Sequence, residues 1–269
     1  IDLQTICFKE RAMRTAALTI ATSLLASVAH AGIIEVDSFH LGGFYGPDAM
    51  GMPSGTPDND MSFQNYFMGR TTVEGFTTEE RRTFFAFDLS GVFGAIPEGE
   101  KIVSVSFEFE LLFGGVIANF TDDAPEHVTF SSTSTPYEAI VDPDAFGISP
   151  EEVWETLGTG TPYAGFDIVP GGTLPGPHAV DLAPEAIMDM ELAASMDEVF
   201  VLSGKLDTYD PAMDALYEFV FGLSDIVVDS TPTGMPVPKL VITTAPIPAP
   251  SGLAILGIAG LLTAHRRRD

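Results

Sequence analysis

The chain has 269 residues, of which 38 are Asp or Glu and only 12 are Lys or Arg, so its formal net charge at pH 7 is −26. A surface this acidic repels phosphate backbones and anionic lipid, which excludes nucleic acid as a partner. The single cysteine, Cys7, lies near the N-terminus. The residues after it therefore contain no disulfide, thiolate nucleophile or cysteine-ligated zinc.

The first predicted element is a secretory signal peptide over residues 13–31. Its parts follow the expected order: a basic start at Met13-Arg14, an uncharged apolar run over 16–28, and a small-x-small cleavage site formed by Ala29 and Ala31. We expect signal peptidase to cut here, so that the mature chain begins at Gly32. Residues 1–12 do not fit ahead of a signal peptide, and we interpret them as a misplaced start before Met13.

Residues 32–244 are expected to form one secreted domain, followed by a C-terminal tail over 245–269. Outside the leader and the tail, six Lys and Arg stand against 35 Asp and Glu, a net charge near −29. Such a domain stays in solution and attracts cations. Because it has no cysteine, its hydrophobic core alone must stabilise it.

Strands dominate the predicted elements of this domain. The clearest is Lys101–Phe113, where apolar residues alternate with Ser and Glu, the period of a half-buried strand. Phe85, Phe87 and Leu89 likewise share one face of a strand over 83–90. The other strand candidates, separated by Gly and Pro, are 33–40, 65–69, 127–130, 137–141, 178–182, 198–202, 216–221 and 239–243.

Two short helices interrupt the strands. The first runs through Leu157, with Ser149 as N-cap and Pro150 at its first position. The second is Pro184–Ala194. Many short strands without strand–helix–strand alternation predict an all-β fold, an antiparallel, jelly-roll-like β-sandwich. We expect an N-terminal signal helix and a C-terminal hydrophobic helix to flank it.

The stretch Arg81–Gly91 (RRTFFAFDLSG) is followed by Ile96–Ile102 (IPEGEKI) and then by the alternating strand. This succession resembles a pattern of secreted jelly-roll modules related to carbohydrate-binding domains, and the resemblance extends over about 65–244. Phe107 and Phe109 depart from it, since small or aliphatic residues are usual there, as does a longer insert over 142–172. The matched residues are mostly core and turn positions, so they imply the fold more than a ligand.

The tail combines a Pro-rich hinge, an apolar run over 253–264 and a terminal arginine cluster. Such a run enters a bilayer with its arginines on the cytoplasmic side. The tail resembles the PEP-CTERM sorting signal of Gram-negative bacteria, with Ala249 in place of the hallmark Glu. The resemblance implies removal by an exosortase-type membrane protease and export through the inner membrane to the outer surface or extracellular matrix. The residues that carry it are Pro248, Pro250, Ser251, Arg266, Arg267 and Arg268.

A retained membrane anchor is the alternative for this tail. Ser251–His265 would form about 22 Å of helix at about 1.5 Å per residue, whereas a hydrocarbon core is about 30 Å thick. The segment therefore suits a transient, processed insertion better than a permanent span.

Catalysis is not expected. His40, His127 and His178 are far apart in sequence, and a triad or zinc site would need two or three of them to converge. Carboxylates are abundant, but no spacing singles out the pair that a glycosidase needs. We predict no required cofactor.

Among metals, a structural calcium ion is favoured over zinc. Asp58, Asn59 and Asp60 place three oxygen donors in one loop, as Ca²⁺ prefers. Asp122-Asp123 and Asp142/Asp144 are weaker candidates. The alternative is that Asp and Asn simply favour turns.

Three functions follow, in this order. The first is a non-catalytic surface or matrix protein embedded in exopolysaccharide or biofilm. The second is a carbohydrate-binding module, and an exposed aromatic row would favour it. The third is a secreted glycoside hydrolase, which needs a deep cleft with convergent carboxylates. The aromatic residues that could stack on a sugar are Tyr45, Tyr66, Tyr137, Trp154 and Tyr163, although Trp154 is expected to be a packing anchor.

Overall fold

A computed structural model describes most of the predicted secreted domain. The described residues are 31–46, 64–73, 76–77, 80–111, 126–169, 176–207, 217–224 and 236–247. The chain divides into a larger compact unit, residues 33–98 and 102–244, and a smaller one, residues 1–32, 99–101 and 245–269. Within the smaller unit, the Ile247 amide donates to the Gly99 carbonyl oxygen at 2.7 Å. The predicted signal helix and hydrophobic tail helix lie outside the described residues.

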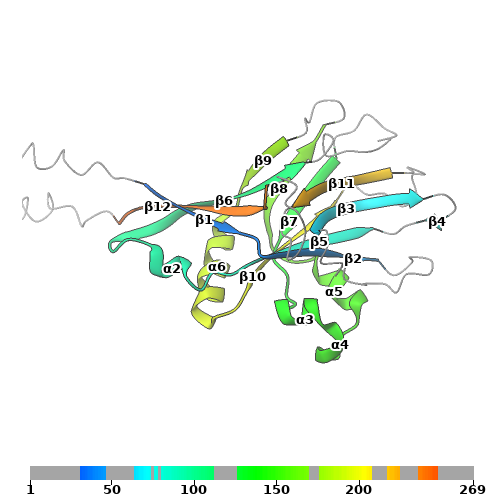
Figure 1. The fold of residues 1–269 in the computed structure, drawn as a ribbon, viewed down its shortest axis with the longest axis horizontal. Helices are drawn as coiled ribbons and strands as arrows, with labels where there is room; N and C mark the ends of the chain where they lie inside the picture. The colour runs from blue at the N-terminus through cyan, green and yellow to red at the C-terminus, as the bar shows by residue number, and fades with distance from the viewer. Residues whose placement is uncertain are drawn as a thin grey trace, which may run out of the picture. The chain divides into compact units, whose positions relative to one another are not determined.

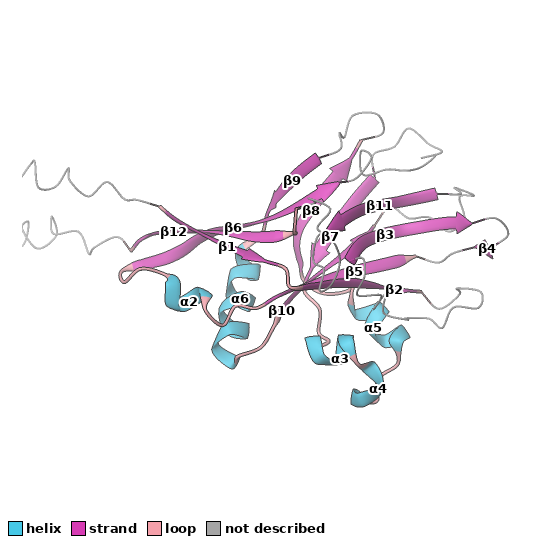
Figure 2. Cartoon of the chain, in the orientation of Figure 1, coloured by secondary structure: helices cyan, strands magenta, loops and turns pink. Residues whose placement is uncertain are grey.

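Two antiparallel sheets pack as a sandwich (Figures 1 and 2). The first sheet has the order β1-β12-β6-β9. Its strands are β1 (Gly32–Asp37), β12 (Lys239–Pro246), β6 (Glu100–Leu111) and β9 (Gly176–Asp181).

The second sheet has the order β11-β3-β5-β10-β7-β8, with β2 also paired to β5 and β4 to β3. Its strands are β2 (His40–Tyr45), β3 (Gln64–Val73), β4 (Phe76–Thr77), β5 (Arg81–Phe87), β7 (Glu126–Ser131), β8 (Pro162–Ile168), β10 (Phe200–Leu206) and β11 (Tyr217–Ser224).

Aromatic side chains fill the space between the sheets. Phe107 on β6 lies 4.9 Å, centroid to centroid, from Phe85 on β5 and 5.1 Å from Phe130 on β7. All three are fully buried in one cluster. These rings bury large apolar areas, and their tilted and edge-on contacts add to the stabilisation. The sandwich is therefore held together largely by phenylalanine.

The strand β5 is buried on both faces, because successive side chains point to opposite sides of a sheet. Phe85 and Phe87 enter the core between the sheets, as predicted. Phe84 points the other way, into a second cluster that contains Ile140 and Val153. These come from α3 (Tyr137–Val141) and α5 (Pro150–Thr156), which cover this part of the outer face. The short helix α4 (Pro143–Phe146) lies between them in sequence.

The predicted helix at Ser149 is confirmed, and its start is held by a capping box. The Ser149 hydroxyl accepts from the Glu152 amide at 3.1 Å, and the Glu152 carboxylate accepts from the Ser149 amide at 2.6 Å. The second predicted helix is also confirmed as α6 (Pro184–Met196), with Pro184 in its first turn.

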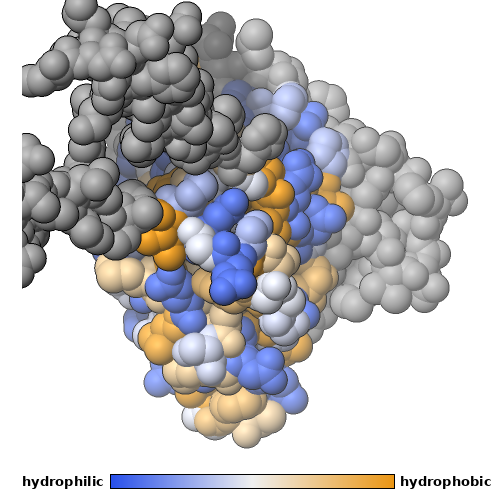
Figure 3. Space-filling model, turned by 90° about the vertical axis from the view of Figure 1, so that its left-hand side faces the viewer, coloured by the Kyte–Doolittle hydropathy of each residue, from blue (hydrophilic) through white to orange (hydrophobic). Residues whose placement is uncertain are grey.

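The helix α6 buries one side and leaves apolar residues on another. Ala186 and Met190 belong to the main core, whereas Met188, Leu192 and Met196, spaced four residues apart, are more than half exposed. Figure 3 shows apolar (orange) and hydrophilic (blue) residues interspersed on the face seen from the left of Figure 1.

Several sequence predictions need correction. The strand predicted over 137–141 is helix α3: Ala139 and Ile140 both direct their amides to the Pro136 carbonyl, and both side chains are buried. Burial has overridden the strand preference of Tyr, Ile and Val. The described residues contain five helices and not two, because α3, α4 and α2 (Val92–Ala95) join α5 and α6.

Two strand boundaries also differ. The strand predicted over 33–40 is two strands, β1 and β2, interrupted at Ser38-Phe39, and β2 extends into the predicted loop. The strand β8 was not predicted. In β6 the alternation holds from Val105 to Leu111, but Val103 is 46% exposed because the buried positions shift by one residue after Ile102.

Candidate functional site

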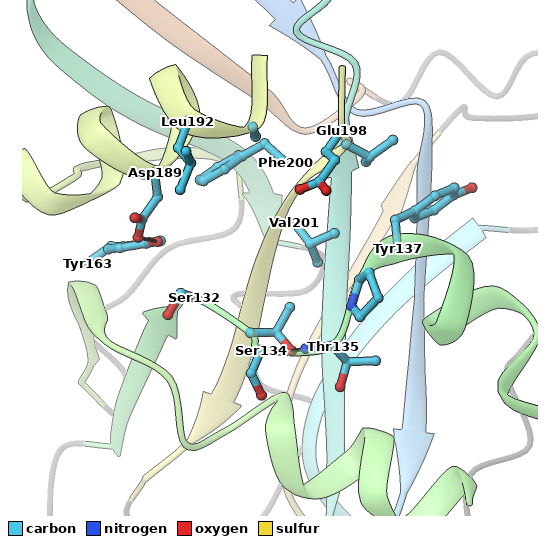
Figure 4. A pocket seen from close by; sticks show the side chains of 14 residues that line it. Ser132, Ser134, Thr135, Tyr137, Tyr163, Asp189, Leu192, Glu198, Phe200 and Val201 are labelled. Carbon is cyan, nitrogen blue, oxygen red and sulfur yellow. Dashed lines mark hydrogen bonds between the residues drawn. The ribbon is translucent and has the colours of Figure 1, made fainter. Parts of the chain in front are cut away.

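The best candidate site is a pocket of about 300 Å³ beside α6 (Figure 4). The segment Ser132–Tyr137, which leads from β7 into α3, forms one wall. Glu198–Val201, which leads into β10, forms the base, and α6 contributes Asp189, Leu192 and Ala193. Tyr163 of β8 completes the lining. The pocket thus lies where two connections and one helix meet the large sheet.

Short hydrogen bonds fix the Ser132 wall. The Ser132 amide donates to the Thr161 carbonyl at 3.0 Å, and the Thr161 amide donates to the Ser132 hydroxyl oxygen at 2.9 Å. Farther along, the hydroxyl of Thr135 pairs with that of Thr156 at 2.7 Å. Ser134, between them, is exposed to solvent. The Ser132 hydroxyl is therefore held by a backbone amide and the Thr135 hydroxyl by a side chain.

The opposite side of the pocket carries two carboxylates. Asp189 accepts a short hydrogen bond from the Tyr163 hydroxyl. Glu198 is placed by the end of α6, where Asp197 adopts φ 57° and the Glu198 amide donates to the Ala193 carbonyl at 2.9 Å. Figure 4 shows the Glu198 carboxylate directed into the pocket. Within the part of the chain that the structure describes, no group pairs with this carboxylate.

Tyr163 remains a hydrogen-bond donor. Burial, and then the neighbouring Asp189, raise the pKa of its phenol well above the ordinary value, so the hydroxyl keeps its proton. The ring stacks against Phe200, with centroids 6.2 Å apart and planes inclined by 23°. Tyr163 therefore orients Asp189 while its ring packs in the main core beside Phe200.

Tyr137 contributes its ring to the pocket while its hydroxyl is engaged elsewhere. The hydroxyl oxygen lies 2.9 Å from Nδ1 of His40 on β2. The His40 ring in turn meets Phe84 edge-on at 5.3 Å. The Tyr137 side of the pocket is thus anchored to the sheet through a buried histidine.

This anchor predicts a pH dependence of stability. Burial lowers the pKa of His40 below its usual value of about 6.5. The unfolded chain therefore binds this proton more tightly than the folded chain does. The contribution of neutral His40 to the free energy of unfolding is present above about pH 6.5 and is lost as pH falls through the folded-state pKa. We expect the free energy of unfolding, from urea titrations at pH 7.5 and 5.5, to fall less in His40→Gln than in the parent. Equal pH slopes would contradict this assignment.

The structure brings together two of the five aromatic residues considered as sugar platforms, Tyr137 and Tyr163. Tyr66 is fully buried in the core, and Tyr45 lies under the Arg81 guanidinium, 5.3 Å from the ring centroid. Trp154 packs against the Arg82 guanidinium at 3.7 Å and donates to the Glu80 carbonyl at 3.0 Å. Its expected role as a packing anchor is confirmed.

The candidate calcium ligands Asp58, Asn59 and Asp60 lie outside the described residues. Asp142, one of the weaker candidates, caps α4 by accepting from the Ala145 amide at 3.2 Å. No group of three or more acidic, His or Cys residues suited to a metal ion occurs in the described ranges.

The predicted processing residues also fall outside the described part of the chain, except Ala31. Among the helices described, none has the length and hydropathy needed to cross a membrane.

The acidic residues of the pocket were missed by sequence reasoning. Asp189 and Glu198 are two of many carboxylates, and neither lies in a motif. One signal was available: Asp197-Glu198 lies three residues after the end of the predicted second helix, close to where the chain must reverse.

Fold and site together define a β-sandwich protein with a pocket that carries two carboxylates at the junction of α6 and the large sheet. Comparison of the chain with protein-family models and with curated proteins found no match.

Proposed function

We propose that the chain is an exported, tail-sorted and non-catalytic protein of the outer surface or extracellular matrix of a Gram-negative bacterium, associated with exopolysaccharide or biofilm. The observation that carries this proposal is the position of the sandwich. Its strands begin at Gly32, directly after the predicted signal peptide, and end at Pro246, two residues into the predicted sorting tail. Signal peptidase and an exosortase-type protease would be its partners in transit.

We further take the sandwich to be jelly-roll-like. Support comes from the two matched motifs, since Arg81–Gly91 forms β5 and the turn after it, and Ile96–Ile102 leads into β6. No cofactor is required, and a structural calcium ion at Asp58, Asn59 and Asp60 stays a proposal.

Cell fractionation tests the proposal. The chain is expressed in a Gram-negative host that has an exosortase and in the same host without it, together with a variant in which Arg266, Arg267 and Arg268 are replaced by Gln. We expect the parent protein outside the outer membrane of the host that has the exosortase. In the host without it, the parent protein should stay in the inner membrane, and the variant should stay there in both hosts. Recovery of the parent protein from the cytoplasm with its signal peptide intact would overturn the proposal.

A second candidate function, carbohydrate binding, is favoured by the pocket itself. Tyr137 offers a half-buried ring and Ser134 an exposed hydroxyl group, whereas the Tyr163 and Phe200 rings are buried. Sugar sites combine such apolar surfaces with a few oriented polar groups. A glycoside hydrolase is supported less, because Asp189 is engaged by Tyr163 and Glu198 is solvent-exposed, whereas a glycosidase acid needs a partly apolar cleft.

A further inference from the structure

We propose that the exposed side of α6 is a docking surface for another protein, and that this partner contributes a basic amphipathic helix. The surface consists of Met188, Leu192 and Met196, which we call the α6 row. The inference goes beyond both the export proposal and the carbohydrate-binding candidate, because it depends on α6 and its surroundings alone.

The α6 row is a continuous apolar surface. Its three side chains are 58%, 57% and 52% exposed. They are spaced four residues apart, so they lie above one another on one side of the helix, over about 12 Å at about 1.5 Å per residue. Single exposed apolar residues are normal on a protein surface. Among the described residues, however, α6 is the only element that exposes more than one large apolar side chain, which indicates an interaction surface.

The shape of this surface suits a helix. Residues spaced four apart form a ridge on a helix, and such ridges pack into the grooves of a facing helix. Two cavities adjoin the last two turns of α6: the pocket of about 300 Å³ that Leu192 borders (Figure 4), and one of about 260 Å³ lined by Ala194 and Asp197. Side chains of a facing helix can enter these cavities while its backbone follows the α6 row. The two methionines add adaptability, because their unbranched side chains fit partners of different shape.

The charges around the α6 row define the chemistry of the partner. Residues 184–198 contain five Asp and Glu and neither Lys nor Arg. Glu185 and Glu191 lie three residues before and after Met188, so both are its neighbours on the helix surface, and both are exposed. Asp197 and Glu198 are exposed at the end of the row. A partner that carries Lys or Arg beside its apolar face therefore meets opposite charge along the whole row.

The same charges disfavour the other two occupants of an exposed apolar helix face. A second copy of this chain, docked through its own α6, would bring Glu185 and Glu191 close to their counterparts, and like charges across an interface are unfavourable. An anionic lipid surface would be repelled for the same reason. A basic amphipathic helix satisfies both the apolar row and its acidic border, as in other complexes in which a helix binds through residues at helical spacing.

Calorimetric titration of the purified protein with three 18-residue peptides tests the proposal. The first contains only Leu and Lys, with its leucines three and four residues apart so that they share one helix face. The second has the same composition, rearranged so that no face is apolar, and the third has the first pattern with Glu in place of Lys. We expect the first to bind at least about tenfold more tightly than the second, the size of one buried apolar side chain. The third should bind more weakly still, because its charge has the wrong sign.

The variant Leu192→Gln should lose about tenfold in affinity for the first peptide, because it removes the central side chain of the α6 row. The matched control is Phe146→Gln, the same replacement at a position of α4 that is 53% exposed. It should leave the affinity within about twofold, since Phe146 lies outside the row. Thermal melts should be the same for both variants, because both side chains are exposed.

Each other outcome overturns the proposal in a recognisable way. Equal binding of the rearranged peptide, or equal losses in the two variants, would show attraction by the overall negative charge of the protein. Equal binding of the Glu peptide would remove the requirement for a basic partner. Sedimentation that finds a dimer of the parent, lost in Leu192→Gln, would assign the α6 row to a second copy. No binding of the first peptide would remove the docking surface, whereas the export proposal is judged separately by fractionation.

Discussion

Replacement of Phe107 by Ala should lower the free energy of unfolding by about 3–5 kcal/mol, the range for a buried phenylalanine. Phe107 is fully buried and contacts the rings of Phe85, Phe87, Phe109 and Phe130. Counting Phe107 itself, three of the five rings belong to the large sheet and two to the small one. Truncation would leave a cavity between the sheets that neither can close alone.

Denaturant titration followed by circular dichroism measures this loss. The matched control is Phe146→Ala on α4, where the ring is 53% exposed and the change should stay within about 0.5 kcal/mol. Comparable effects at the two positions would mean that Phe107 does not join the sheets, and would contradict the sandwich packing.

Replacement of Gly160 by Ala should destabilise the protein by about 3 kcal/mol, the upper part of the range for overpacking. A Cβ at this position would lie far inside van der Waals contact of the Ser132 carbonyl oxygen, which belongs to the backbone and has no rotamer to relieve the clash. The adjacent Ser132–Thr161 hydrogen bonds form one wall of the pocket. We therefore expect weaker ligand binding as well as a lower melting temperature.

Gly94→Ala is the control for this change. A Cβ there meets nothing within 4 Å, and Gly94 lies inside helix α2, where alanine is preferred by up to about 1 kcal/mol. Gly94→Ala should be neutral or slightly stabilising in the same melts. If Gly160→Ala is equally harmless, the close approach of residues 160 and 132 is wrong.

Local sequence patterns predicted most of the strands and helices because each of these patterns reflects a local physical cause. Alternation in Lys101–Phe113 identified β6, and Ser149 with Pro150 identified the start of α5. The error at 137–141 has a different origin. Tyr137–Val141 has strand-forming residues, but its helix is fixed by Pro136 and by burial of Ile140 in the cluster that contains Phe84, which brings together residues far apart in sequence.

The candidate site was predictable only in part. Aromatic residues are few enough to be considered one by one, so Tyr137 and Tyr163 were considered as sugar platforms before their common pocket was known. Carboxylates are too numerous for that approach. What distinguishes Asp189 and Glu198 is the packing of α6 beside β10 and the hydrogen bond from Tyr163, and both depend on tertiary structure.

The composition of the acidic domain is consistent with the proposed export. A cysteine-free sandwich stabilised by an aromatic core needs no oxidative folding step after export. Its net negative charge would favour solubility at the proposed location outside the cell. Export and docking on α6 are separate proposals with separate tests.

Intact-mass analysis of the protein recovered from outside the cells tests the central proposal most directly. The account predicts a single chain that begins at Gly32 and has lost the apolar run and arginines that follow the Pro248–Pro250 hinge. A mass that still includes both the signal peptide and the tail would contradict it.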